Sequence, residues 1–315
     1  MQAARLFAAQ HHPVLIQAGK SNSREDLFEL LERHREELDG LRLAHGGVLL
    51  RGFDIGGAAD FRAAVNLLGG EPYGYVGGNS PRRRVAQDVY TSTEYPAAEN
   101  ISLHNEMSYL PCSPARLFFY CLEPAELGGQ TPLCSGRDVM EAIPADIADQ
   151  FGSRRLRYIR NFDPSLKISK TWQATYNTDD RDELAEILSR QDSTCTWGAD
   201  GTLRVTTVRD AFATHPETGE QVWFNQAEQW HPSALNPKLR ALYGPRGMCA
   251  HDCRFGDGEA IPDAMLERIR AVVAANELLF DWQKNDLLMI DNFSFMHGRR
   301  PFTGNRTTLA YLSAT

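Results

Sequence analysis

Apolar side chains near the start of the chain recur at helical spacing. Between residues 23 and 41 they return every three or four positions, which predicts one amphipathic helix that buries a single face. Ser23 and Asp26 stand three positions apart at its start, as in a capping box. An apolar run at 48–50 then predicts a buried strand, and a second helix is expected over residues 58–68.

From about residue 85 the pattern changes to short strand-like runs that are separated by turn residues. The expected strands are 85–90, 101–106, 117–122, 156–159, 203–207, 221–224, 278–280, 287–291 and 307–312. Helices are expected at 180–190 and at 262–275, where proline occupies the first position. Many short strands without strict strand–helix alternation predict a mainly β fold, an antiparallel sandwich or barrel with helical decoration. A doubly wound fold is disfavoured because the chain has no glycine-rich nucleotide motif.

Composition and charge narrow the function classes. The chain has 315 residues, of which 42% are hydrophobic and 23% charged, an ordinary globular mixture. Forty-one acidic and thirty-three basic residues give a net charge of −8, which argues against a dedicated nucleic-acid binder. The longest apolar runs are too short to span a membrane, and the first twenty residues do not resemble a signal peptide. We therefore expect a cytoplasmic protein with no nucleic-acid or membrane partner.

The six cysteines are few and widely spaced. Cys249 and Cys253 flank His251, so three zinc-type ligands lie within five positions. A structural zinc site usually has four ligands, and the sequence shows no second half of such a site. Scattered reduced thiols are therefore the favoured interpretation, with a zinc site as the alternative.

The sharpest chemical pattern is the pair His104 and Glu106. On a strand, residues i and i+2 point to the same face, so the imidazole and the carboxylate are expected to project together while Asn105 faces the other way. Such a pair is half of a metal site. The alternative is a histidine–glutamate pair on the surface, because the pattern also arises by chance.

Two further residues could complete the site. His297 follows a strand that ends in Asp291 and Asn292, and it would supply a second imidazole. Two histidines and one carboxylate leave three coordination positions open, as non-haem Fe(II) oxygenases require. Arg306, nine residues later, offers a planar fork that matches a carboxylate. The alternatives are a core histidine at position 297 and a salt-bridged surface arginine at position 306.

Taken together, these motifs resemble the TauD/TfdA family of Fe(II)/2-oxoglutarate-dependent dioxygenases. The resemblance extends from about residue 46 to the C-terminus and looks most like the SyrP-like aspartyl hydroxylase branch. The segments that carry it are His104-x-Glu106, Gly128-Gly129-Gln130-Thr131-Pro132-Leu133, Asp291-Asn292, His297-Gly298-Arg299 and Gly304-x-Arg306. The combination of motifs in this order is specific, although each one alone is common.

The resemblance implies a double-stranded β-helix, or jelly roll, of the clavaminate synthase-like type. It implies that His104, Glu106 and His297 bind Fe(II), and that Arg306 and Thr131 bind the distal carboxylate of 2-oxoglutarate. Oxygen would be the second co-substrate. Ala310 stands where taurine dioxygenase has a second arginine, which disfavours a sulfonate substrate. The presence of Glu106 disfavours the related halogenases, which lack this carboxylate.

The sequence also indicates the domain organisation and the candidate substrate-binding residues. We expect a single oxygenase domain over residues 1–315, with an N-terminal elaboration at 1–84 and a lid-like insertion at 160–215; a plain surface loop is the alternative to the lid. The candidate substrate-binding residues are polar or aromatic positions in or beside these motifs: Asn105, Tyr109, Asn161, Gln226, Trp230 and Arg299.

The implied activity is hydroxylation of an unactivated C–H bond, at Cβ of an amino acid or of a carrier-tethered aminoacyl group, in natural-product biosynthesis. The basic run Arg82-Arg83-Arg84 could receive the phosphate of a carrier arm or an acidic carrier protein, although a solvated charge run is the simpler interpretation. Desaturation, epoxidation or cyclisation with the same cofactors is one alternative. A cupin-like metal hydrolase or isomerase is a second, and a non-catalytic jelly-roll binding protein is a third.

Overall fold

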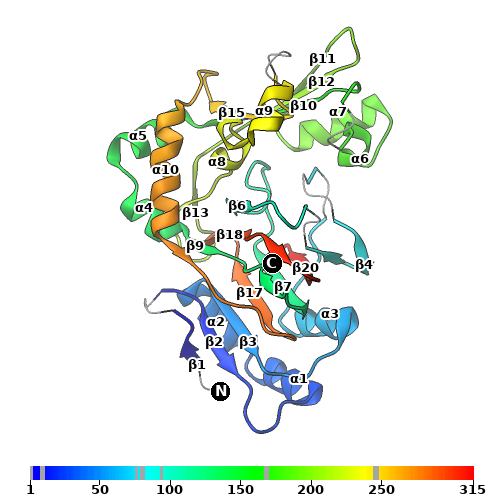
Figure 1. Cartoon of the computed structure of the whole chain (residues 1–315), viewed down its shortest axis with the longest axis vertical. Coiled ribbons are helices and arrows are strands. Elements are labelled where there is room, and N and C mark those ends of the chain that lie inside the picture. The colour runs from blue at the N-terminus through cyan, green and yellow to red at the C-terminus, as the bar shows by residue number, and fades with distance from the viewer. Residues whose placement is uncertain are drawn as a thin grey trace.

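The fold consists of two facing β-sheets with helical layers outside them (Figure 1). The computed structural model describes residues 3–7, 11–74, 77–78, 82–92, 95–166, 170–243 and 248–315. The larger sheet has the order β1-β2-β3-β17-β7-β20-β5-β4. Its strands are β1 (Ala3–Arg5), β2 (Val14–Gln17), β3 (Gly47–Arg51), β17 (Leu287–Asp291), β7 (Arg116–Glu123), β20 (Thr307–Ser313), β5 (Val89–Thr91) and β4 (Arg84–Ala86). All neighbours are antiparallel except β2 and β3.

The smaller sheet faces the larger one and carries two of the three candidate metal ligands. Its order is β16-β9-β18-β6, with β16 (Glu277–Leu278), β9 (Leu133–Ser135), β18 (Phe295–Arg299) and β6 (Ile101–His104). A separate two-stranded antiparallel pair joins β8 (Leu127–Gly128) to β19 (Phe302–Thr303). The two sheets form a double-stranded β-helix, which confirms the predicted fold.

Three N-terminal helices cover the outer face of the larger sheet. These are α1 (Arg24–Arg33), α2 (Arg35–His45) and α3 (Gly57–Leu67). Leu27 and Leu38 are fully buried in the same core as Phe118 of β7. The prediction of one continuous helix was wrong, because the backbone leaves helical geometry at His34 (φ −118°, ψ 20°). The predicted capping box at Ser23 is present.

A second group of elements packs around the jelly roll, at the top and along the left side of Figure 1. A four-stranded sheet has the order β11-β12-β10-β15, and β13 pairs with β14. The bounds are β10 (Leu156–Phe162), β11 (Ser193–Trp197), β12 (Leu203–Arg209), β13 (Phe212–Thr214), β14 (Gln221–Trp223), β15 (His251–Phe255), α4 (Gly136–Ala142), α5 (Ala145–Arg154), α6 (Trp172–Tyr176), α7 (Arg181–Arg190), α8 (Ala227–Trp230), the 3-10 helix η1 (Pro232–Ala234), α9 (Pro237–Tyr243) and α10 (Asp263–Ala275).

The lid-like insertion predicted at 160–215 therefore supplies most of an accessory sheet and two helices, α6 and α7. Residues 167–169 of that segment lie outside the described residues. Its strands and helices form a small core of their own, with Phe162, Leu184 and Leu203 at the centre. Movement of this segment as a lid stays a prediction.

Several strand predictions need correction. The strand expected at 85–90 is two strands, β4 and β5, which a turn at Asp88 separates (φ 61°). The strand expected at 101–106 ends at His104, because the following residues form a turn in which Met107 has φ 55°. The sequence did not predict β18, the strand that carries His297. It also did not predict the strands β1, β2, β8, β9, β11, β13, β15 and β19 or the helices α4, α5, α6, α8 and α9.

The six cysteines are free thiols. Among the described residues, the one cluster of three metal-ligand side chains contains neither Cys249 nor Cys253. Among the same residues, no helix combines the length and the apolar character that crossing a bilayer requires.

Candidate metal centre

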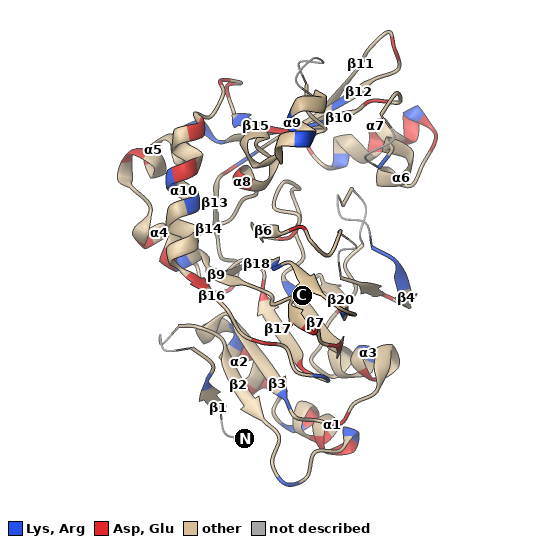
Figure 2. Ribbon diagram, in the orientation of Figure 1, with Lys and Arg blue, Asp and Glu red and all other residues tan. Residues whose placement is uncertain are grey.

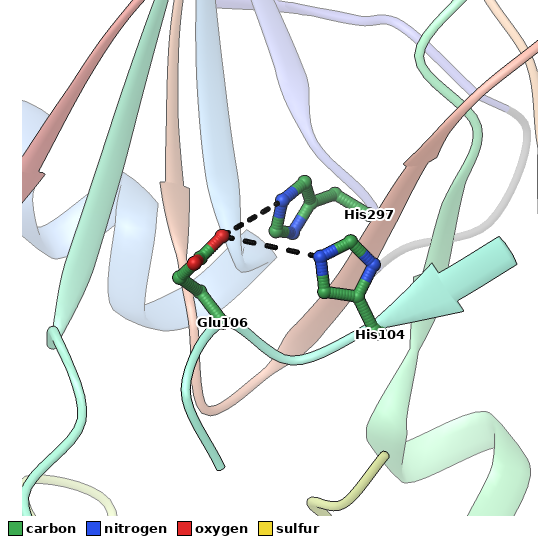
Figure 3. Close-up of side chains that lie close together, drawn as sticks. All are labelled: His104, Glu106 and His297. Atoms are coloured by element: carbon green, nitrogen blue, oxygen red, sulfur yellow. Dashed lines mark ion pairs between the residues drawn. The ribbon is translucent and has the colours of Figure 1, made fainter. Parts of the chain in front are cut away.

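His104, Glu106 and His297 converge between the two sheets (Figure 3). His104 is the last residue of β6, His297 is central in β18, and the backbone pairs these two residues directly. Oε2 of Glu106 lies 3.9 Å from Nε2 of His104 and 3.7 Å from Nε2 of His297. A metal ion that binds each donor at about 2.1 Å fits between atoms at these separations. The three side chains are 5–9% exposed, so an ion there would be largely shielded from water.

Both imidazoles are in the state that a metal ligand needs. Burial lowers the pKa of His104. Burial also lowers the pKa of His297, to well below its usual value, and the neighbouring His104 and the charge of Arg82 lower the pKa of His297 further. Each ring is therefore neutral at physiological pH and offers a lone pair. Nδ1 of His104 lies 2.9 Å from the Ser102 carbonyl oxygen. The hydrogen bond places the proton on Nδ1, and Nε2 then faces the site as an acceptor.

The turn that carries Glu106 is held by Asn292, which the sequence marked only as part of a motif. The side chain of Asn292 accepts a hydrogen bond from the Glu106 amide at 2.8 Å. It donates to the Glu106 carbonyl at 3.0 Å and to the Pro114 carbonyl at 2.8 Å. Since Glu106 lies beyond the end of β6, these bonds, and not the alternation of a strand, orient its backbone. No sequence pattern shows this contact, which joins positions 186 residues apart.

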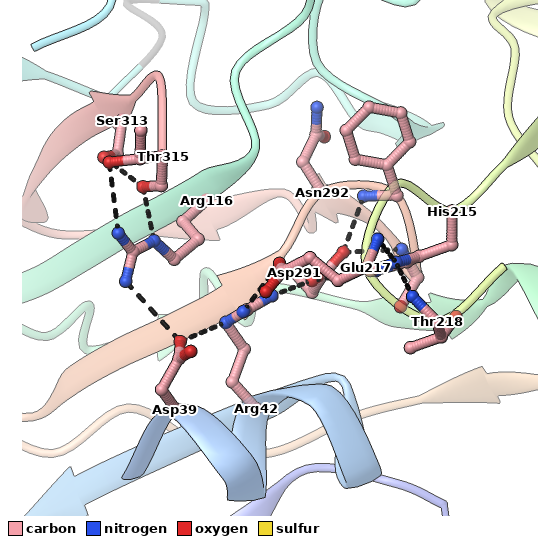
Figure 4. A network of polar contacts seen from close by, with 12 residues as sticks. Asp39, Arg42, Arg116, His215, Glu217, Thr218, Asp291, Asn292, Ser313 and Thr315 are labelled. Atoms are coloured by element: carbon pink, nitrogen blue, oxygen red, sulfur yellow. Dashed lines mark hydrogen bonds and ion pairs between the residues drawn. The ribbon is translucent and has the colours of Figure 1, made fainter. Parts of the chain in front are cut away.

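Asp291, the neighbour of Asn292, belongs to a buried polar network (Figure 4). Its carboxylate pairs with Arg42 of α2 and lies 3.1 Å from Nε2 of His215. Its Oδ1 also accepts hydrogen bonds from the amides of Phe293 and Ser294. Burial alone would raise the pKa of Asp291, but the bond from His215 and the charge of Arg42 hold it below the ordinary value. Contacts from Arg42 and from His215 therefore hold the β17–β18 turn in place.

A pocket beside the two histidines contains the residues predicted to bind a diacid. Thr131 and Arg306 line it together with His104 and His297. Nε of Arg306 donates to the Gly129 carbonyl at 2.9 Å. Within the described part of the chain, the two Nη atoms have no hydrogen-bond acceptor and no carboxylate partner. Burial lowers the pKa of this guanidinium to about 10, so it remains a cation at neutral pH.

The glycine pair in the Gly-Gly-x-Thr motif makes room for this arginine. Gly129 has φ +72°, and a Cβ there would lie 2.9 Å from Cδ of Arg306. Gly128 has φ +76°, and its Cβ would meet the Pro301 carbonyl oxygen at 2.2 Å. Both positions therefore require glycine for conformation and for space.

Thr131 is oriented by a tryptophan that sequence reasoning missed. Nε1 of Trp282 donates to Oγ1 of Thr131 at 3.0 Å, and Thr131 is 3% exposed. Because this bond uses one lone pair of the hydroxyl, its proton is free to point to an anion in the pocket.

Three of the six candidate substrate residues are held by contacts to the backbone or to other side chains, although Oδ1 of Asn105 has no hydrogen-bond partner among the described residues. Arg299 lines the pocket, but its guanidinium donates to the carbonyls of Tyr95, Pro96 and Glu99. Asn105 is fully buried and donates to the Asn292 carbonyl. Asn161 donates to the Cys249 carbonyl and accepts from Arg204. These contacts indicate positioning roles and give no support to direct substrate contact.

The other three candidates lie together next to the turn that carries Glu106. Gln226 donates to the Asn105 carbonyl at 2.6 Å, and its Oε1 accepts from Nε1 of Trp230 at 2.9 Å. The rings of Trp230 and Tyr109 are 4.7 Å apart. Arg160 of β10, another residue that was not predicted, lies 5.3 Å from each of these two rings. The result is a buried aromatic wall on the side of the accessory sheet.

A jelly roll that unites two histidines and a carboxylate, beside a pocket with a buried arginine, has the architecture of the non-haem Fe(II) oxygenases. The family model described as taurine catabolism dioxygenase TauD, TfdA family, matches residues 12–312. The chain therefore belongs to the TauD/TfdA family, and it is an Fe(II)/2-oxoglutarate-dependent dioxygenase, as the sequence motifs implied.

Individual relatives agree with this membership. The dapdiamide synthesis protein DdaC of Enterobacter agglomerans is 34% identical over 304 residues, which is 96% of this chain and 91% of the relative. A clavaminate synthase-like protein of Arabidopsis thaliana is 28% identical and covers 90% of this chain and 86% of the relative.

Solved structures share the fold at low identity. PvcB, described as an Fe, alpha-ketoglutarate dependent oxygenase from an isonitrile synthetic pathway, has a TM-score of 0.53 at 16% identity and covers 96% of this chain and 86% of its own. AAD-2, solved with Mn(II) and N-oxalylglycine, has a TM-score of 0.59 at 13% identity, with 99% and 97% covered.

Proposed function

We propose that this dioxygenase hydroxylates an unactivated C–H bond, at the β-carbon of an amino acid or of a carrier-tethered aminoacyl group, in natural-product biosynthesis. The observation that carries the oxygenase chemistry is the convergence of His104, Glu106 and His297 beside the pocket of Arg306. The biosynthetic context is supported by DdaC, which is described as a dapdiamide synthesis protein, and by PvcB, described as coming from an isonitrile pathway.

In this proposal the three converging side chains hold Fe(II). His104 and His297 supply neutral Nε2 donors, and Glu106 supplies the negative charge. The set fits iron because two imidazoles and one carboxylate leave coordination positions for a co-substrate and for oxygen. Asn292 keeps the backbone of Glu106 in place, and the Ser102 carbonyl keeps the tautomer of His104.

The pocket beside the histidines holds 2-oxoglutarate. Arg306 binds the distal carboxylate with its two Nη atoms, and Thr131 donates its hydroxyl proton to the same group. A buried carboxylate without such partners would be strongly disfavoured, so the pair selects a diacid over a monoacid. Trp282 fixes the hydroxyl, and Gly129 admits the arginine.

When bound, the iron supplies the centre at which oxygen and 2-oxoglutarate react with the substrate. One oxygen atom enters succinate as carbon dioxide leaves, and the other is inserted into the C–H bond, so that R–H becomes R–OH. The protein binds, orients and excludes water. Tyr109 and Trp230 are our candidates for the wall against which the substrate packs, and the segment 160–215 is our candidate for its cover. Ala310 is fully buried on β20 and offers no positive charge to a sulfonate, which supports a substrate without that group.

The test is succinate release from purified protein with Fe(II), 2-oxoglutarate and oxygen, against a panel of free and carrier-loaded amino acids. We expect one or a few panel members to stimulate succinate formation and to gain the mass of one oxygen atom. A substrate that loses two hydrogens instead would show desaturation, which the same site can perform. If every panel member leaves succinate formation at its background rate, an amino-acid substrate is excluded.

A cupin-like hydrolase or isomerase is not retained. That class has no use for a diacid clamp, and the family match over residues 12–312 assigns the chain to dioxygenases.

A further inference from the structure

The basic run at residues 82–84 divides between the surface and the metal centre. Arg83 and Arg84 are exposed at the start of the edge strand β4, where Figure 2 shows a stretch of positive charge. The side chain of Arg82 turns inward instead and is 5% exposed. The sequence suggested that all three arginines are solvated, but the structure places the guanidinium of Arg82 in the interior.

The inward arginine contacts the carboxylate of the metal centre. Nη2 of Arg82 lies 2.7 Å from Oε2 of Glu106. This oxygen is also the one that faces both imidazoles, at 3.9 Å and 3.7 Å. Arg82 lines the same pocket as Thr131 and Arg306. One carboxylate oxygen is thus shared between a fixed cation and the place where a metal cation would bind.

We propose that Arg82 competes with the metal ion for Glu106 and thereby makes metal binding depend on 2-oxoglutarate. The inference rests on the proposed roles of His104, Glu106 and Arg306. A divalent ion at Oε2 must displace the guanidinium or accept its repulsion, and in a buried site with low effective dielectric this repulsion is large. Metal binding without co-substrate is therefore weakened.

The co-substrate removes this penalty because of its charge. 2-Oxoglutarate brings two negative charges into the pocket, of which Arg306 neutralises one. The second pairs with the guanidinium that the metal ion displaces from Glu106, and this new pair makes up for the one that is lost. By thermodynamic linkage, the metal and the co-substrate then increase each other's affinity by the same factor, and Arg82 sets part of this factor. An iron-loaded but empty site, which could react wastefully with oxygen, becomes less populated.

The test measures Mn(II) affinity by calorimetry under conditions without turnover, with and without 2-oxoglutarate. Arg82→Gln keeps a hydrogen-bond donor and removes the charge, Arg82→Lys keeps the charge, and Arg84→Gln is the matched control on the exposed part of the run. We expect Arg82→Gln to bind Mn(II) about tenfold more tightly than the wild type without 2-oxoglutarate. The gain in Mn(II) affinity on adding 2-oxoglutarate should shrink accordingly, and Arg82→Lys and Arg84→Gln should behave like the wild type.

Two results would overturn the inference. Equal or weaker Mn(II) binding by Arg82→Gln would show that the arginine supports the loaded site instead of competing with the metal. An unchanged effect of 2-oxoglutarate in Arg82→Gln would show that the coupling does not pass through this charge. Absence of Mn(II) binding in the wild type would instead refute the proposed metal centre, and this inference with it.

Discussion

At the scale of single residues, the proposed site divides metal binding from co-substrate binding within one pocket. In this proposal His104 and His297 hold the metal, while Arg306 and Thr131 bind the far end of the co-substrate; all four residues line the same pocket. Because these groups sit on different strands and loops, the metal ligands and the co-substrate ligands can be changed separately. We therefore expect variants that weaken co-substrate binding and leave metal binding intact.

Replacing Arg306 by alanine should raise the KM for 2-oxoglutarate by about 100-fold, since a charged partner of a buried carboxylate is lost. Mn(II) affinity in the absence of 2-oxoglutarate should stay within about twofold of the wild type. Succinate formation at varied 2-oxoglutarate measures the first effect and calorimetry the second. Arg300→Ala, which removes a neighbouring surface arginine that pairs with Glu277, is the control. An unchanged KM in Arg306→Ala would remove this residue from the co-substrate site.

Trp282 provides a finer test of the same pocket. Trp282→Phe keeps an aromatic side chain but loses the donor to Thr131, so the hydroxyl is free to rotate away from the proposed co-substrate position. We expect the KM for 2-oxoglutarate to rise about three- to tenfold, the usual worth of one neutral hydrogen bond. Trp197→Phe, in the accessory sheet, should leave it unchanged. Equal values in the two variants would contradict a positioning role for Trp282.

At the scale of elements, the β17–β18 turn fixes both ends of the metal centre. Its Asn292 holds the turn with Glu106, and the strand that follows carries His297. Asn292→Ala leaves a buried amide and two buried carbonyls without this partner, so the free energy of unfolding should fall by about 2–4 kcal/mol. Mn(II) affinity should fall by about tenfold as Glu106 loses its support.

Chemical denaturation and calorimetry check these two effects of Asn292→Ala. Asn276→Ala, at the C-terminal end of α10, is the matched control and should leave Mn(II) binding unchanged. If Asn292→Ala is destabilised yet binds Mn(II) like the wild type, the asparagine supports the fold without positioning the ligand.

The sequence predicted those elements whose signals are local. The mainly β character, about half of the strands and the capping box at Ser23 follow from spacing that is visible within a few residues, whereas the jelly roll was implied only by the resemblance to the family. The pair His104 and Glu106 was found although the assumed strand ends at His104, because the turn brings the carboxylate to the same place. The inward position of Arg82 and the bonds of Asn292 and Trp282 could not be read, since each depends on a partner far away in the sequence.

At the scale of the whole molecule, Arg42 joins the N-terminal helices to the jelly roll. Its guanidinium contacts Asp39, Glu217 and Asp291, and it is 2% exposed (Figure 4). Arg42→Met should lower the free energy of unfolding by about 3–5 kcal/mol, because a buried carboxylate loses its cation. The double variant Arg42→Met/Asp291→Asn should recover part of this loss. Denaturant titrations test both, and a loss below about 1 kcal/mol would contradict the role of this pair.

The same network gives a pH dependence with a definite sign. Since the folded pKa of Asp291 is lower than the unfolded one, its contribution to stability is present above about pH 4 and is lost as the pH falls through the folded value. The stability difference between the wild type and Arg42→Met should therefore be largest near neutral pH and shrink as the pH falls into the acid range. A difference that grows on acidification would contradict the assignment.

Every role proposed above depends on the binding of one iron ion by His104, Glu106 and His297, which 2-oxoglutarate then joins. An anaerobic titration with Fe(II) followed by 2-oxoglutarate, monitored by visible absorption, measures this binding. We expect a charge-transfer band that needs both additions, saturates at one equivalent of each per chain, and is absent in Glu106→Ala. A band of equal strength in Glu106→Ala, or no band in the wild type, would show that these residues do not form an iron site.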